Sequence, residues 1–260
     1  MRRLTAFACA GEQLIGSLDE AAGTTGLLIV SGGNEIRAGA HRGMAMLAAR
    51  LAAEGTPVFR YDRRGTGDSD GMNHGFRAGR DDLFAAAQAF RKEAPHVARL
   101  VGFGNCDAAT LLVLHGREAG IARILLANPW VVEPEDDLPP APAIRAHYAA
   151  RLRDPAIWRR LFTGGISMSK FFRGLARISR KPSSDTFTTH TLSAIAGWGA
   201  DASVILAEGD ATAIAYADAA KGKGIAPRTI TIPSDSHSFA RPADAAALET
   251  AIRDLVNACE

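Results

Sequence analysis

A strand, a tight turn and a helix are compressed into residues 100–114, and a cysteine stands at the turn. The segment is LVGFGNCDAATLLVL, so apolar runs flank the turn on both sides of Cys106. The small residues Gly104 and Ala108, two positions before and after the cysteine, allow the strand and the helix to pack closely. A buried strand that runs directly into a helix predicts an α/β architecture.

The position of the thiol has chemical consequences. Backbone N–H groups at a helix N-terminus carry positive partial charge, which stabilises both a thiolate and a developing oxyanion. The segment has the form of a nucleophile elbow, with Cys106 where serine more often stands. A free cysteine is also commonly a small buried hydrophobic residue, so the motif alone leaves both interpretations open.

Strand and helix patterns alternate along most of the chain. This rhythm predicts a mostly parallel central sheet flanked by helices, a core formed by residues 1–132 and 196–260. We expect strands at 4–9, 13–18, 26–30, 58–61, 100–103, 124–128, 203–207 and 228–232. We expect helices at 41–53, 81–93, 107–116, 213–222 and 244–258.

The rhythm breaks at residues 133–195, which we expect to form an inserted helical lid. An acidic, proline-rich stretch at 133–142 precedes a basic segment at 143–181, and the residues after it are polar. Apolar residues are interleaved with the basic ones, which favours an amphipathic segment over a fully solvated one. The basic residues are Arg145, Arg151, Arg153, Arg159, Arg160, Lys170, Arg173, Arg177, Arg180 and Lys181.

Composition excludes several functional classes. The formal net charge is only +2, which gives no electrostatic case for a nucleic-acid partner. No stretch has the length of a membrane span, and the apolar run after Met1 is too short for a signal peptide. Three cysteines far apart predict neither a disulfide framework nor a metal site, and we expect a cytoplasmic protein without a cofactor.

A thiol nucleophile needs a base and an acid that orients it. His237 follows the last predicted strand, and Asp210 follows the strand before it, in the chain order nucleophile, acid, histidine. Asp210 also has the position of a helix N-cap, and Glu208 and Asp235 are competing candidates for the acid. Backbone N–H groups of Asp107 and of Gly33 or Asn34 are the predicted oxyanion donors.

These motifs together resemble the α/β-hydrolase superfamily over nearly the whole chain. The resemblance is carried by SGG at 31–33, YDRRGTGDSDG at 61–71, the cysteine elbow, Gly209-Asp210 and the HSF sequence at 237–239. More narrowly, the chain resembles the exosortase A system-associated hydrolases of type 1. That likeness rests on Arg37 and His41 after the glycine turn, on the Cys106-Asp107 pair and on Trp158-Arg159-Arg160.

The resemblance implies a link to exopolysaccharide and protein-sorting systems, without a known substrate. A cysteine in place of serine is similar to dienelactone hydrolases, and the sequence departs from the superfamily pattern again at Ala108, where glycine is usual. By the same likeness, Glu35 is a candidate neighbour of the thiol, although a solvated loop charge is the plainer interpretation. Glu35, Arg37, His41 and Trp158 are the candidates for the mouth of the site.

The sequence therefore predicts a Cys-His-Asp hydrolase that acts on a small activated ester, thioester or lactone. Two alternatives stay open: an acyltransferase to a glycan or other alcohol, and a non-catalytic binding protein of the same fold. The basic segment at 143–181 predicts peripheral contact with an anionic membrane or an acidic glycan precursor.

Overall fold

The computed structural model of this protein describes residues 1–132 and 186–258. Its strands are β1 (Arg2–Cys9), β2 (Glu12–Asp19), β3 (Thr25–Val30), β4 (Val58–Tyr61), β5 (Arg99–Asn105), β6 (Arg123–Ala127), β7 (Ala202–Ala207) and β8 (Arg228–Ile232). Within this described part they form an eight-stranded sheet in the order β1-β2-β4-β3-β5-β6-β7-β8. The strands β3 to β8 pair with one another in parallel, whereas β2 pairs antiparallel with both β1 and β4. The predicted sheet is confirmed.

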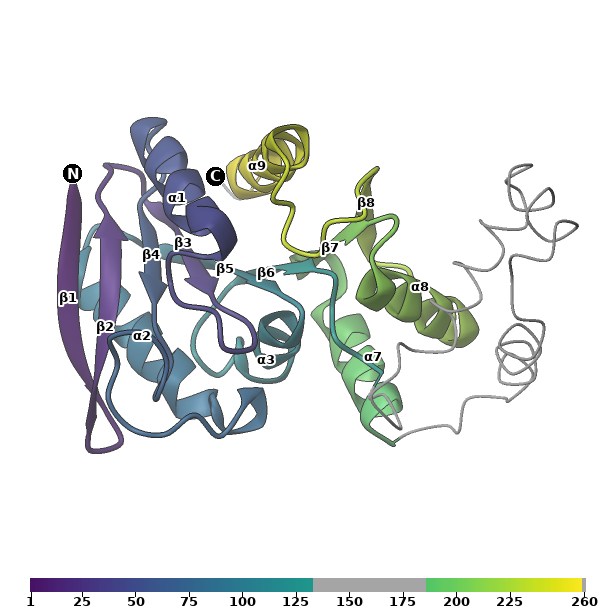
Figure 1. The fold of residues 1–260 in the computed structure, drawn as a ribbon, viewed down its shortest axis with the longest axis horizontal. Coiled ribbons are helices and arrows are strands. Elements are labelled where there is room, and N and C mark those ends of the chain that lie inside the picture. Colours follow the sequence, from purple (N-terminus) through teal and green to yellow (C-terminus); the bar gives the residue numbers. More distant parts are fainter. Residues whose placement is uncertain (133–185, 259–260) are drawn as a thin grey trace, which may run out of the picture.

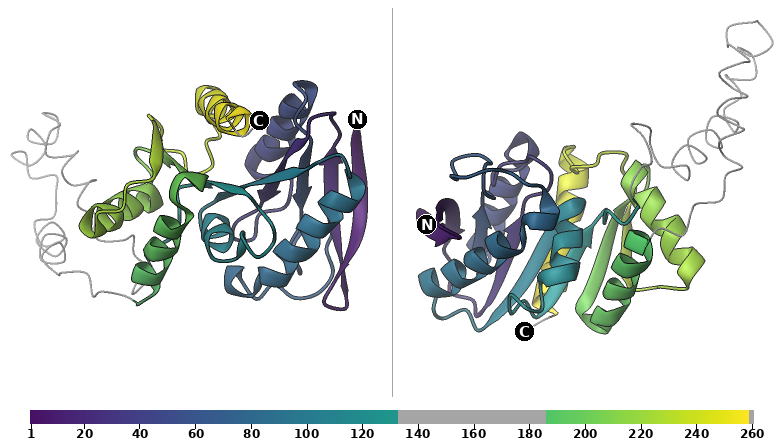
Figure 2. Two further views of the ribbon diagram at one scale, coloured as in Figure 1. Left: turned by 180° about the vertical axis from the view of Figure 1, so that it is seen from behind. Right: turned by 90° about the horizontal axis from the view of Figure 1, so that it is seen from below.

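Helices cover both faces of the sheet (Figures 1 and 2). The helices α1 (Gly43–Ala53) and α9 (Pro242–Asn257) pack on one face. The other face carries α2 (Arg80–Glu93), α3 (Asp107–His115), α7 (Thr186–Trp198) and α8 (Ala211–Lys223). Because both faces are covered, central strands such as β3 and β7 are buried along their whole length, which explains their continuous apolar sequences.

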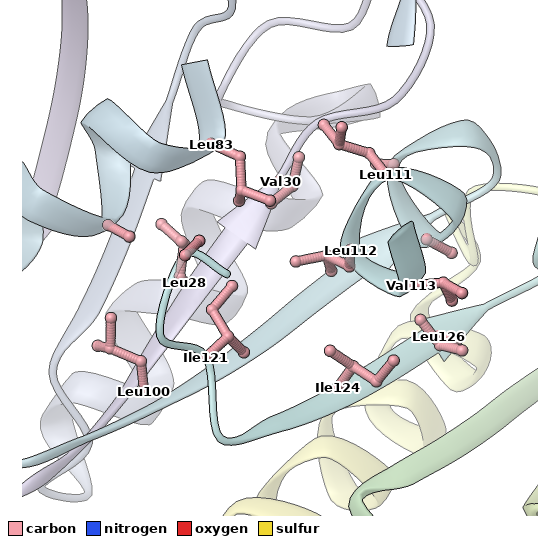
Figure 3. Packing of buried hydrophobic residues seen from close by; sticks show 14 of the residues in the cluster. Leu28, Val30, Leu83, Leu100, Leu111, Leu112, Val113, Ile121, Ile124 and Leu126 are labelled. Carbon is pink, nitrogen blue, oxygen red and sulfur yellow. The ribbon is translucent and has the colours of Figure 1, made fainter. Parts of the chain in front are cut away.

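The core beneath α3 fixes the start of that helix. Leu112 on α3 packs near Ile124 and Leu126 of β6, and all three are fully buried (Figure 3). Each such side chain contributes about 1.5–3 kcal/mol through burial. The close approach requires glycine in β5, since a Cβ at Gly102 would lie 2.7 Å from Leu112. Cys106, the residue that precedes α3, is therefore held next to the closely packed core of α3, β5 and β6.

Several element ends differ from the sequence prediction by one or two residues, and two boundaries differ in a way that changes the interpretation. The helix expected at 41–53 begins only at Gly43, because His41 and Arg42 adopt left-handed backbone conformations with φ of 51° and 61°. A short 3₁₀ turn, η1 (Ala40–Arg42), occupies that place. The expected insertion boundary at 195 falls inside α7, whose Leu192 and Ile195 are buried in the core.

Residues 133–185, which include the basic segment and Trp158, lie outside the described residues. Two further 3₁₀ turns connect the helices and strands, η2 (Phe76–Ala78) and η3 (Gly199–Asp201). In the part of the chain that the structure describes, no helix has the length and hydrophobicity needed to cross a bilayer.

Candidate active site

Cys106 occupies the turn between β5 and α3 in a strained backbone conformation, with φ 60° and ψ −124°. A residue other than glycine in such a conformation costs of the order of 1–3 kcal/mol and persists only where its surroundings hold it. Here the N–H of Cys106 donates to the Ala127 carbonyl at 2.9 Å, and its carbonyl accepts the N–H of Trp130 at 3.2 Å. The turn is thus fastened to the end of β6.

The small residues around Cys106 are required by the close packing of strand and helix. A Cβ on Gly104 would lie 2.7 Å from the backbone carbon of Ala108, so no larger residue fits there. Ala108 itself is fully buried. Cys106 is free and partly exposed at this turn, where the first N–H groups of α3 have no carbonyl partner within the helix.

His237 and Asp210 meet at the same edge of the sheet. His237 lies in the loop after β8, and its Nδ1 is 2.9 Å from Oδ2 of Asp210, the residue that precedes α8. The other carboxylate oxygen of Asp210 accepts the N–H groups of Thr212 and Ala213 at 3.0 and 2.9 Å. Asp210 is therefore both the N-cap of α8 and the partner of His237, because its two oxygens serve different donors.

The hydrogen-bond partners of His237 favour its protonated, positively charged form. The hydrogen bond with Asp210 and, after it, the hydrogen bond with the Cys106 side chain together raise the pKa of His237 to about 10. Burial alone would raise the pKa of Asp210, but the hydrogen bonds from His237 and from the backbone at Ala213 outweigh it, so the pKa lies below its ordinary value. The site therefore favours an imidazolium between the Asp210 carboxylate and the Cys106 sulfur.

The other acids considered for the same role face elsewhere. Asp235 pairs with Arg241 on the surface, and Glu208 is exposed. Asp210 is buried and touches the imidazole. Of these three carboxylates, the geometry brings Asp210 alone into contact with His237.

Two asparagines hold the histidine loop, and sequence reasoning missed their part. The carbonyl of His237 accepts hydrogen bonds from Nδ2 of Asn105 at 3.0 Å and of Asn128 at 3.2 Å. Asn128 is fully buried, and its own Oδ1 accepts the N–H of Ala207 at 2.9 Å. The signal in the sequence was a polar residue directly at the end of each of two buried strands, β5 and β6.

The glycine turn after β3 lies against the start of α3. The N–H of Gly33, a predicted oxyanion donor, donates to Oδ1 of Asp107 at 2.8 Å. The carbonyl of Gly33 accepts from the buried Arg63. The side chain of Asn34 accepts from Asn73 at 2.9 Å. The structure therefore brings Gly33 beside the elbow, but the Asp107 carboxylate already accepts the Gly33 N–H, and no contact of the Asn34 N–H with the elbow is formed in the described part of the chain.

The residues predicted for the mouth of the site have other partners. Glu35 accepts the N–H of Ala40 at 2.7 Å, which ties its carboxylate to its own loop. Arg37 pairs with the buried Asp62 and, at 2.9 Å, with Asp68, and thereby joins two loops. His41 is exposed on η1, and Trp158 lies outside the described residues.

Two pockets lie in the described part of the chain near these elements. One of about 20 Å³ lies between the glycine turn and the loop after β8, with Gly32, Asn105 and Ser238 in its lining, and holds no more than a water-sized molecule. A larger pocket of about 330 Å³ opens between η2, α3 and α7. It is lined mainly by apolar groups such as Leu111 and Phe187, and the three candidate catalytic residues do not line it.

Metal-ligating residues do not cluster within residues 1–132 and 186–258, where no group of three or more His, Cys, Asp or Glu side chains could hold an ion. The chemistry that Cys106, His237 and Asp210 offer is nucleophilic and acid–base. A sulfur at a helix N-terminus, a charged imidazole and a buried carboxylate can together attack and release an acyl group.

Comparison with known proteins supports the same architecture. Among solved structures, an esterase from Pyrococcus furiosus superposes with a TM-score of 0.66 at 12% identity and covers 99% of this chain and 90% of its own. A thioesterase domain from the curacin biosynthetic pathway gives 0.61 at 14% identity, with 98% and 99% covered. A lidless α/β serine hydrolase from Xanthomonas campestris gives 0.61 at 17% identity, with 98% and 94% covered.

These likenesses establish the fold. No curated protein sequence matches the chain. A family model, described as the alpha/beta hydrolase family, matches residues 27–250, a span that contains the glycine turn, the elbow, Asp210 and His237. The chain belongs to the alpha/beta hydrolase family.

Proposed function

We propose that this protein is a hydrolase in which Cys106, His237 and Asp210 act as nucleophile, proton-transfer group and orienting acid. The observation that carries the proposal is the contact of His237 with Asp210 at 2.9 Å beside the strained turn of Cys106. A packed structural cysteine would need neither a histidine partner nor a left-handed backbone.

The charged histidine sets the starting state of the reaction. Because the pKa of His237 is raised to about 10, the imidazole holds its proton at neutral pH and places a positive charge beside the Cys106 sulfur. The thiolate attacks the carbonyl carbon, and His237 gives its proton to the leaving group as that bond breaks. Water then attacks the acyl carbon while His237 takes one of its protons, and the C–S bond breaks to release the carboxylic acid and restore the thiolate.

The sulfur selects activated acyl donors. A thiolate leaves a tetrahedral intermediate more readily than an alkoxide does, so intermediates from amides or simple alkyl esters return to the starting material. Thioesters, lactones and aryl or enol esters carry leaving groups good enough to compete. The proposed substrates are therefore small activated esters, thioesters or lactones, and the resemblance to exosortase-associated hydrolases connects them with exopolysaccharide or protein-sorting systems.

The proposed partners follow from the charge of the segment at 143–181. Its ten basic residues favour an acidic glycan precursor or an anionic membrane surface near the site. This part of the proposal rests on sequence alone, since the segment lies outside the described residues.

Turnover of an activated ester tests the function. We expect Cys106→Ala to abolish hydrolysis of p-nitrophenyl acetate, because no other group can hold the acyl chain, and Cys106→Ser to retain little. The matched control is Cys9→Ala, which removes the buried thiol of β1 and should leave the rate unchanged. Wild-type rates in Cys106→Ala would refute the assignment of the nucleophile. Adding an alcohol acceptor and analysing the products distinguishes hydrolysis from acyl transfer.

A further inference from the structure

The aspartate after Cys106 lies where the reaction would place negative charge. Oδ1 of Asp107 is 2.8 Å from the backbone nitrogen of Gly33, the donor predicted for an oxyanion. The same oxygen lies 2.7 Å from the position that a Cβ on Gly32 would take. The glycine turn is therefore closed around this carboxylate, and a side chain at residue 32 would collide with it.

Arg63 lies against both residues of this contact, Gly33 and Asp107. Its guanidinium donates to the Gly33 carbonyl and lies 3.9 Å from Oδ2 of Asp107. The Arg63 side chain is only 3% exposed, and its Nε and Nη1 are buried with no hydrogen-bond partner in the described part of the chain. A buried guanidinium with so few partners strongly favours a nearby anion, and Asp107 is the anion that the structure provides.

An N–H group that donates to a carboxylate cannot donate fully to an oxyanion at the same time. A second negative charge at that place would also be repelled by the first. With Asp107 in its observed position, a tetrahedral intermediate on Cys106 would keep the N–H of residue 107 at the start of α3 and lack that of Gly33.

We propose that Asp107 controls the acylation step: its carboxylate closes the oxyanion site, and acylation of Cys106 requires this side chain to turn away from Gly33. This inference rests on the proposed function. The change is a rotation of one side chain, in which the Gly33 N–H passes from the carboxylate to the substrate oxygen. Asp107 thereby raises the barrier to acylation of Cys106, so that strongly activated acyl donors react in preference to weakly activated ones.

A purely structural role for Asp107 predicts the opposite outcome. An acidic residue in the first turn stabilises a helix, and the bond to Gly33 fastens the loop after β3. If that were its whole contribution, removing the carboxylate would loosen the loop and slow acylation. The two accounts therefore differ in the sign of the effect.

The test compares two reactions of the same sulfur in the full-length chain. Acylation by p-nitrophenyl acetate passes through an oxyanion, whereas alkylation by iodoacetamide displaces iodide at a saturated carbon and needs no oxyanion site. The ratio of the two rate constants at Cys106 isolates the oxyanion contribution from changes in thiolate reactivity. One oxyanion donor is worth roughly 10²–10³-fold in rate.

For Asp107→Ala we expect this ratio to rise by about tenfold or more. Asp107→Asn keeps the shape and one acceptor oxygen but loses the charge, so it should give a smaller rise, and it serves as the test if the alanine variant unfolds below the assay temperature. The matched control is Asp235→Ala, which removes one exposed carboxylate from the neighbouring loop and should leave the ratio unchanged.

An unchanged or lower ratio in both Asp107 variants would overturn the inference. Its failure differs from a failure of the proposed function. If acetylation maps to Cys106 and the ratio does not rise, the role of Asp107 alone is wrong. If Cys106→Ala is still acetylated at the wild-type rate, the nucleophile assignment fails and the inference fails with it.

Discussion

Cys106 and Cys9 both stand at the end of a strand, yet their surroundings give them opposite character. Cys9 ends β1, is 4% exposed and lies 3.4 Å from a carboxylate oxygen of Asp82. Burial and, after it, the charge of Asp82 together raise the pKa of the Cys9 thiol to about 11. Cys106 instead stands at the start of a helix beside a charged histidine.

The comparison shows that partners decide the role of a thiol more than its place on a strand does. Asp82 accepts from Cys9 and is itself paired with Arg64, so this group of residues holds a neutral S–H in the core. At Cys106 the sulfur is hydrogen-bonded to a histidine whose pKa is raised to about 10, and the start of α3 presents backbone N–H groups. The same residue type is thus a packing element in one place and a candidate nucleophile in the other.

The largest effect should come from removing the positive partner of Cys106. We expect His237→Ala to slow acylation by roughly 10²–10⁴-fold, because the proton-transfer group is lost. Asp210→Asn should have a smaller effect, since the histidine stays but loses its orienting charge. Stopped-flow acylation by p-nitrophenyl acetate measures both.

Two neighbouring carboxylates provide controls for this experiment. Glu208→Gln and Asp235→Asn change charge near the site without touching His237, so their acylation rates should stay at the wild-type value. If Asp210→Asn were neutral while either control slowed the reaction, the identity of the acid would be wrong and the fold would be unaffected.

Selective alkylation sharpens the contrast between the two thiols. Because the pKa of Cys9 is about 11, on the order of one molecule in a few thousand carries Cys9 as a thiolate at pH 7.5. Iodoacetamide should therefore label Cys106 long before Cys9, as followed by peptide mass spectrometry. Cys259 lies outside the described residues and is replaced by alanine in this experiment. Equal labelling of Cys9 and Cys106 would remove the difference on which the comparison rests.

A smaller effect should appear in the pH dependence of stability. The pKa of His237 rises from 6.5 to about 10 on folding, so its contribution to the free energy of unfolding is complete below pH 6.5 and is lost as the pH rises through 10. The pKa of Asp210 is lowered, so its contribution is present above 3.8 and is lost at lower pH.

Urea unfolding of the wild type and of His237→Ala at pH 5, 7 and 9.5 measures this dependence. The difference in unfolding free energy should be largest at pH 5 and smallest at pH 9.5. The side chain is 43% exposed, so solvent screening keeps the difference modest. A difference that grew with pH would mean that His237 is neutral in the folded protein.

Local patterns were sufficient to predict most of the fold. Apolar runs such as residues 26–30 predict buried strands without information from the rest of the chain. The elbow is specified by Gly104, Cys106 and Ala108, which lie within five residues of one another. The helix α7 was missed because its first turns are polar, and Leu192, Ile195 and Trp198 become a buried face only against α3. The left-handed conformations of His41 and Arg42 could not be predicted, because neither residue is a glycine.

The site was predictable as far as chain order determines it. Asp210 and His237 follow neighbouring parallel strands, so the carboxyl ends of those strands bring them to the same edge. Their catalytic roles stay a prediction. The bonds from Asn105 and Asn128 to the His237 carbonyl, and from Gly33 to Asp107, depend on the directions of individual side chains across distant loops. A single sequence carries no rule for those directions.

The central claim is that Cys106, and not Cys9, carries the acyl group. The direct measurement is peptide mapping by mass spectrometry after the protein is mixed with an acyl thioester or p-nitrophenyl acetate and quenched in acid. We expect one acyl group on the peptide that contains Cys106, absent in Cys106→Ala and longer-lived in His237→Ala, where acylation is slow but hydrolysis is slower still. An acyl group on Cys9, or on no cysteine while the ester is still turned over, would contradict it.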